Sequence, residues 1–71
     1  MLSTIEAIRK RYTESGGEDA FFDLLEVAKG MCSSRDDFKA VHKIENDFRD
    51  SRDSDDESFF ALVALAKKLA E

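Results

Sequence analysis

The stretch SFFALVALAKKLA, residues 58–70, decides the fold because it is the most apolar part of the sequence. Its alanines are good helix formers, and its apolar spacing is not the two-residue spacing of a strand. Wound as a helix at about 100° per residue, its large apolar side chains cover roughly 220° of the surface. A surface helix needs a stripe only a little over about 100° wide. This helix must therefore be covered by more than one neighbour, from its own chain or from a second subunit. The side chains concerned are Phe59, Phe60, Leu62, Val63, Leu65 and Leu69.

An earlier segment repeats this stretch without gaps. FFDLLEVAK at 21–29 aligns with FFALVALAK at 59–67, and the two phenylalanines, the first leucine, the alanine and the lysine are identical. The apolar positions of the segments before them also correspond: Leu2, Ile5, Ile8 and Tyr12 match Phe38, Val41, Ile44 and Phe48. The sequence therefore predicts two similar helical hairpins in tandem, at about 3–32 and 34–70. They are either an internal duplication or two amphipathic hairpins that share their spacing.

The helix boundaries of the first hairpin are predicted from caps and glycines. Ser3 and Glu6 are spaced as a capping box, and Gly16 and Gly17 end the first helix because glycine accepts the left-handed geometry of a helix exit. The second helix is expected from about residue 19 to between 29 and 32. Gly30 is either its C-terminal cap or an interior residue.

The second hairpin shows similar signals. Ser33 or Ser34 caps the third helix, whose expected buried face is Phe38, Val41, Ile44 and Phe48. Residues 50–53 form a polar loop, and residues 54–57 form a capping box that starts the last helix. The fold class predicted from these signals is all-α: four short helices in two similar hairpins, closing as a compact bundle-like arrangement or pairing across a dimer.

Length and composition narrow the possibilities further. The chain has 71 residues and is expected to be a single helical domain, residues 1–71, of marginal stability. One cysteine, Cys32, excludes an internal disulfide and favours a reducing compartment. Neither a signal peptide nor a membrane-spanning segment is recognisable, so we expect a cytoplasmic protein without membrane contact. The net charge of −5 argues against general affinity for nucleic acid.

A basic stripe is the most informative surface feature of this acidic chain. Six polar or basic residues of the third helix lie within roughly 120° of its circumference, opposite the apolar face. The stripe could contact phosphates or an acidic patch on a partner protein. Alternatively, it is a solvated face paired with Glu45, Asp47 and Asp50. The six residues are Arg35, Lys39, His42, Lys43, Asn46 and Arg49.

The same region resembles the helix-turn-helix motif of phage repressors over roughly 20 residues. Val27, Ala28 and Met31 would lie on the first helix, and Phe38 and Val41 would anchor the second helix to it. The resemblance implies a turn through residues 32–34 and DNA contacts from Arg35, Lys39 and Lys43. The sequence departs from the motif because Cys32 and Ser33 replace the usual glycine and apolar residue. Asp36 and Asp37 would also lie near phosphates, which repel them.

Residues with catalytic or ligating chemistry are sparse. His42 is the only histidine, and no metal-ligand spacing or nucleophile motif is present. We therefore expect that the protein is not an enzyme and that it holds neither a metal ion nor a cofactor. The favoured function is a small interaction module that binds another protein as a regulator, inhibitor or small subunit. The alternatives are a helix-turn-helix DNA-binding regulator and a self-associating structural subunit. The expected core or homodimer interface is formed by the fourth helix with Phe21 and Phe22 of the second.

Overall fold

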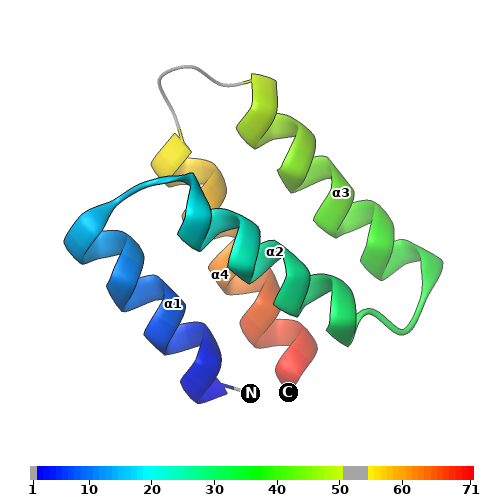
Figure 1. Ribbon diagram of the computed structural model, residues 1–71. Coiled ribbons are helices and arrows are strands. Elements are labelled where there is room, and N and C mark those ends of the chain that lie inside the picture. Colours follow the sequence, from blue (N-terminus) through cyan, green and yellow to red (C-terminus); the bar gives the residue numbers. More distant parts are fainter. Residues whose placement is uncertain (1, 51–54) are drawn as a thin grey trace.

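Four helices build the protein, as predicted, in the computed structural model, which describes residues 2–50 and 55–71. They are α1 (Leu2–Ser15), α2 (Glu18–Met31), α3 (Arg35–Asp50) and α4 (Asp55–Ala70), and no strand occurs in the described ranges. α1 and α3 run in one direction, and α2 and α4 run in the opposite direction (Figure 1). The chain is therefore two antiparallel helical hairpins, α1–α2 and α3–α4.

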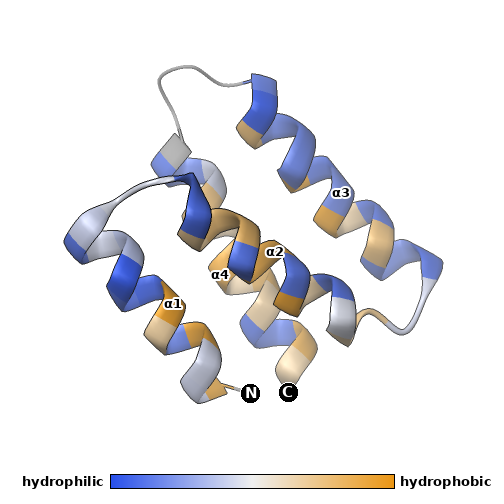
Figure 2. Ribbon diagram, viewed as in Figure 1, coloured by the Kyte–Doolittle hydropathy of each residue, from blue (hydrophilic) through white to orange (hydrophobic). Residues whose placement is uncertain are grey.

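The two hairpins interlock around α2 and α4. α4 packs against all three other helices and α2 does the same, whereas α1 and α3 do not touch each other in the described residues. α1 and α3 flank the central pair on opposite sides (Figure 1). Figure 2 shows the apolar residues gathered along α2 and α4 and on the parts of α1 and α3 next to them. Exchanging α1 with α3 and α2 with α4 reproduces the same pairs of packed helices.

Most of the broad apolar surface of α4 is covered by the protein's own chain, although Phe60 stays 44% exposed. Phe59, Leu62 and Ala66 are 0% exposed, and Val63 is 5% exposed. Leu65 and Leu69 are partly buried against the same core. The outer arc of α4 exposes Ala61, Ala64 and Lys68. The prediction that α4 packs against more than one neighbour is thus confirmed, and the neighbours are the three other helices of the same chain.

Corresponding aromatic residues make corresponding contacts in the two halves. Tyr12 of α1 stacks on Phe59 of α4, with ring centroids 3.8 Å apart and planes 9° apart. Phe48 of α3 stacks on Phe21 of α2, with centroids 3.8 Å apart and planes 8° apart. The third ring of each cluster packs edge-on, Phe60 on Tyr12 and Phe22 on Phe48. Both stacks join one hairpin to the other, so neither hairpin buries its aromatic rings alone.

The repeated lysines also connect the hairpins. Lys67 of α4 lies 2.6 Å from Glu6 of α1, and Lys29 of α2 lies 3.4 Å from Glu45 of α3. The hydrogen bond from Lys67, with a second from Arg9, lowers the pKa of the Glu6 carboxyl below its usual value. The identity of this lysine in both halves therefore has a structural role at the contact between hairpins.

The first hairpin follows the predicted boundaries with one error. α1 ends at Ser15, and Gly16 and Gly17 take positive φ angles of 69° and 97°, as expected of a glycine exit. The predicted Ser3 cap is wrong, because α1 already begins at Leu2. The Glu6 carboxylate, expected to complete that cap, binds Arg9 and Lys67 instead. Gly30 lies inside α2, which continues to Met31.

Ser34 is the cap of α3. Its hydroxyl accepts a hydrogen bond from the Asp37 backbone N–H at 3.2 Å. The Asp37 carboxylate in turn accepts bonds from the Ser33 N–H and hydroxyl, which lowers the pKa of Asp37. Of the polar loop predicted at residues 50–53, Asp50 belongs to α3 and the rest lies outside the described residues. Ser54, the capping residue of the box predicted at residues 54–57, also lies outside them, and α4 begins at Asp55.

Besides Phe38 of α3, three large apolar side chains predicted to share the apolar faces are exposed. Phe22 is 39% exposed and Phe60 is 44% exposed, because each follows a buried phenylalanine by one residue and so lies about 100° around its helix. Leu2, in the first turn of α1, is 51% exposed. Within one chain, these three residues are therefore not part of the buried core. Among the described helices, none combines the length and apolar character needed to cross a membrane.

Candidate functional site

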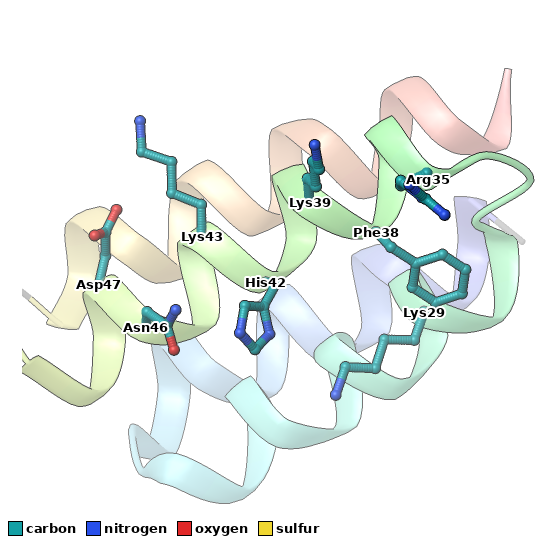
Figure 3. Close-up of a pocket in the computed structure, with 8 residues that line it drawn as sticks. All are labelled: Lys29, Arg35, Phe38, Lys39, His42, Lys43, Asn46 and Asp47. Atoms are coloured by element: carbon teal, nitrogen blue, oxygen red, sulfur yellow. The ribbon is translucent and has the colours of Figure 1, made fainter.

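The predicted basic stripe lies along a groove of about 750 Å³ between α3 and the end of α2 (Figure 3). Five of its six residues line this groove, whereas Arg49 does not. The structure adds Lys29 of α2, together with Phe38 and Asp47 of α3. The complete lining is Lys29, Arg35, Phe38, Lys39, His42, Lys43, Asn46 and Asp47.

Two rows of side chains run along the groove. Arg35, Lys39 and Lys43, here called the cationic row, follow one another at four-residue intervals on α3. Phe38, His42 and Asn46, the central row, lie beside them at the same intervals (Figure 3). The Lys29 side chain approaches the central row from the other side, where α2 passes (Figure 3). The groove thus has the cationic row on one edge and Lys29, which lies 3.4 Å from Glu45, on the other.

Phe38 was predicted to be buried, and that prediction is wrong: its side chain is 50% exposed. On the helical wheel Phe38 is at the margin of the apolar face, about 60° from Val41 and about 40° from His42. Val41 is 0% exposed and Phe48 is 7% exposed, so the core contact of α3 passes through the other side of this face. Phe38 is therefore an aromatic ring placed at the surface among cations.

Among the described residues, no acidic side chain pairs with the cationic row. Arg35, Lys39 and Lys43 form no ion pair with any residue of the described ranges. The pairing expected from Asp47 and Asp50 is likewise not formed within those ranges. These three cations are therefore able to bind an external anion without first breaking an internal contact.

Glu45 is the acid that does pair with the stripe, and it is nearly buried beneath it. Its side chain is 9% exposed and lies 2.9 Å from Arg49, 3.4 Å from Lys29 and 3.8 Å from His42. The pairing expected from Glu45 is thus found for Arg49, while His42 lies at a distance where an ion pair forms only with a protonated imidazole. Sequence spacing suggested Glu45 as a partner but gave no sign of its burial, which depends on α2 passing alongside.

Cys32, in the segment between α2 and α3, is held as a thiol. The thiol donates a hydrogen bond to the Ala28 carbonyl at 3.2 Å, and the side chain is partly buried against the core. Desolvation, aided by the charge of Asp37, raises the pKa of Cys32. A raised pKa lowers the thiolate fraction, so Cys32 has the character of a packing residue rather than of a nucleophile.

The helix-turn-helix resemblance is met in part. Residues 32–34 do connect α2 to α3, and Ala28 and Val41 are both 0% exposed. Phe38, which the resemblance uses as an anchor between the helices, is half exposed instead. Asp37 is engaged in the cap of α3, whereas Asp36 is exposed near the start of the cationic row.

Comparison with models of known protein families, with curated proteins and with solved structures finds no match for this chain. Within the described residues, no three histidine, cysteine or acidic side chains are grouped so that they could hold a metal ion. The candidate site therefore has to be interpreted from its own geometry and charge.

Proposed function

We propose that the protein is a small interaction module that works by binding another protein through the groove on α3. One observation carries the proposal: the half-exposed Phe38 ring is lined up with cations that have no internal partner in the described residues. Aromatic and cationic side chains that become buried together are typical of the energetic centre of a protein interface.

The other half of the molecule provides an internal comparison. In the repeat, Phe38 corresponds to Leu2, and Lys39 and Lys43 correspond to Ser3 and Ala7. α1 packs on α2 and α4 as α3 packs on α4 and α2, yet it does so without these cations. The helix packing therefore does not require the positive charge on α3, which supports a role in binding.

In this proposal the protein acts as a regulator, an inhibitor or a small subunit of an assembly. We propose no catalytic activity and no cofactor for it. We place it in the cytoplasm because its single cysteine is free, as is usual in a reducing compartment.

A DNA-binding regulator is the second candidate. It is favoured by the three-residue connection between α2 and α3 and by the alignment of Arg35, Lys39 and Lys43 along one side of α3. Binding to duplex DNA would weaken steeply with salt, because each phosphate contact adds about 0.9 to the log–log slope. The absence of binding to a duplex at low salt would remove this candidate.

Self-association is the third candidate, and the exposed rings Phe22 and Phe60 are the observation that favours it. Both line shallow pockets beside the turn at Gly16. Light scattering at high micromolar concentration distinguishes a homodimer from a monomer. A monomer throughout this range would remove the homodimer.

Affinity capture from the source cell tests the main proposal. The bait is the intact protein, compared with the double variant Lys39→Glu/Lys43→Glu and with the control Lys10→Glu/Lys68→Glu. The control changes the net charge equally, at exposed sites outside the groove. We expect a stoichiometric foreign protein with the wild type and the control, and its loss with the groove variant. Equal recovery with all three baits would contradict the proposal.

A further inference from the structure

We infer that the groove on α3 binds an acidic amphipathic helix of the partner protein. This inference rests on the proposed function and specifies the chemistry of the bound segment. The bound helix would place apolar side chains against Phe38 and acidic side chains against the cations on either side.

The spacing of the cationic row fits a helical partner. Arg35, Lys39 and Lys43 recur every four residues, so each step along the α3 axis is about 6 Å. Carboxylates at four-residue intervals on a second helix recur at the same rise. A helix lying along α3 can therefore offer carboxylates at the same axial spacing as the cations.

The backbone of α3 disfavours an extended partner. Segments that bind as strands obtain much of their affinity from main-chain hydrogen bonds to an exposed sheet edge. The groove is formed by two helices, α2 and α3, whose backbone groups are already bonded within each helix. A helical segment satisfies its own backbone and contributes only side chains, which is the mode of recognition that grooves between helices use.

Phe38 supplies the apolar part of the contact. Half of its side chain is in solvent, and it lies between the cationic row and Lys29 (Figure 3). A leucine or phenylalanine on the bound helix would bury this ring, with acidic residues to either side of it. The partner helix is therefore amphipathic: a narrow apolar stripe flanked by carboxylates on both sides.

Lys29 can join the contact without leaving a buried charge alone. Its ammonium lies 3.4 Å from Oε1 of Glu45, while Arg49 lies 2.9 Å from Oε2 of the same carboxylate. If Lys29 turns toward an external carboxylate, Arg49 keeps Glu45 paired. This arrangement lets the second edge of the groove exchange an internal anion for a partner's anion.

Charge and shape favour a peptide over DNA in this groove. A row of phosphates offers no apolar group for Phe38, and exposed Asp36 and Asp47 would lie close to the phosphate backbone. A protein segment can place neutral residues opposite both carboxylates, whereas the phosphate backbone has uniform charge. The DNA alternative therefore serves as a competing outcome of the test.

The test uses fluorescence anisotropy with a synthetic probe. The probe is a fluorescein-labelled helix-forming peptide of about four turns, with glutamates every four residues on both sides of a leucine and phenylalanine stripe. A peptide of the same composition in scrambled order and a labelled DNA duplex are the comparisons. We expect saturable binding of the patterned peptide by the wild type, and at least about tenfold weaker binding of the scrambled peptide and of the duplex.

Matched variants locate the contact. Phe38→Ala and Lys39→Glu/Lys43→Glu should each weaken binding of the patterned peptide by about tenfold. Leu2→Ala and Lys10→Glu/Lys68→Glu should leave it unchanged, and Leu2 is a close control because it is 51% exposed at the position that corresponds to Phe38. Circular dichroism verifies that each variant remains folded.

Two results would overturn the inference. One is equal binding of the patterned and scrambled peptides, or stronger binding of the duplex. The other is an affinity for the patterned peptide that none of the groove variants changes. If peptide binding fails while capture from the cell still depends on Lys39 and Lys43, the acidic helix is wrong and the proposed function stands. If capture is independent of these lysines, the proposed function itself is wrong.

Discussion

Leu62→Ala tests whether α4 is the interior of one chain or a surface waiting for a partner. Leu62 is 0% exposed, and α4 packs against all three other helices. Truncating a buried leucine to alanine costs about 2–5 kcal/mol, through lost burial and the cavity left behind. A domain of this size has a total free energy of unfolding of about 4–10 kcal/mol. The substitution is therefore expected to remove a large part of that stability.

The corresponding residue of the first half sharpens the test. Leu24 of α2 matches Leu62 in the repeat and is also 0% exposed. Leu24→Ala should therefore destabilise the protein by a similar amount. Leu2→Ala, at a side chain that is 51% exposed, should change the free energy of unfolding by no more than about 0.5 kcal/mol.

Urea denaturation followed by helical circular dichroism measures these differences. With a slope of about 1 kcal/mol per molar urea, Leu62→Ala should lower the midpoint by about 2 M or more. The wild-type midpoint should not change with protein concentration, because the cover of Leu62 comes from the same chain. A loss of a few tenths of a kcal/mol, with a wild-type midpoint that rises with concentration, would show that a second molecule covers α4.

Three further perturbations follow from individual contacts. A double-mutant cycle of Tyr12→Leu and Phe59→Leu should give a coupling of about 0.5–1.5 kcal/mol for the stacked rings; additive effects in urea titrations would refute the stack. Asp37→Asn should lower the urea midpoint at pH 7. Because the pKa of Asp37 is lowered in the folded protein, this contribution is present above the unfolded pKa of about 3.9 and is lost as pH falls through the folded pKa. The variant and the wild type should therefore converge in acid, and a constant difference down to the lowest pH would contradict the cap. Gly30→Ala should stabilise α2 by about 0.5–1 kcal/mol, because Gly30 is helical and an added Cβ meets nothing within 4 Å; a lower thermal midpoint would show that this space is needed.

Local patterns in the sequence were sufficient to predict the helices and their pairing into hairpins. The end of α1 at Gly16 depends on a backbone conformation that glycine favours, and the start of α3 at Ser34 depends on a hydrogen bond to a residue three positions later. Both signals can be recognised from neighbouring residues in the sequence. The predicted Ser3 cap is not formed because α1 already begins at Leu2, and the Glu6 carboxylate pairs with Arg9 and with Lys67 of α4 instead. The contact with α4 joins the two hairpins and could not be read from local spacing.

The predicted basic stripe and the groove share five residues, because a helical wheel gives the direction of side chains on one helix. The wheel is least informative at the margins of a face, where neighbouring helices decide exposure. Phe38 was misplaced for this reason, and Lys29 was missed because it belongs to α2. Burial of Glu45 likewise required knowing that α2 crosses beside α3.

α3, rather than α4, carries the features that favour binding to a partner protein. The breadth of the apolar face of α4 was the first reason to expect a binding protein, and the chain's own three helices cover most of that face. Near-symmetry of the halves separates what the fold needs from what it does not: buried leucines, stacked rings and cross-hairpin lysines occur in both. The cations beside Phe38, which form no ion pair within residues 2–50 and 56–71, occur in one half, on a helix whose counterpart packs without them. Helix packing does not require these cations, and the net charge of −5 makes a row of them unexpected. We therefore expect the binding surface to lie on α3.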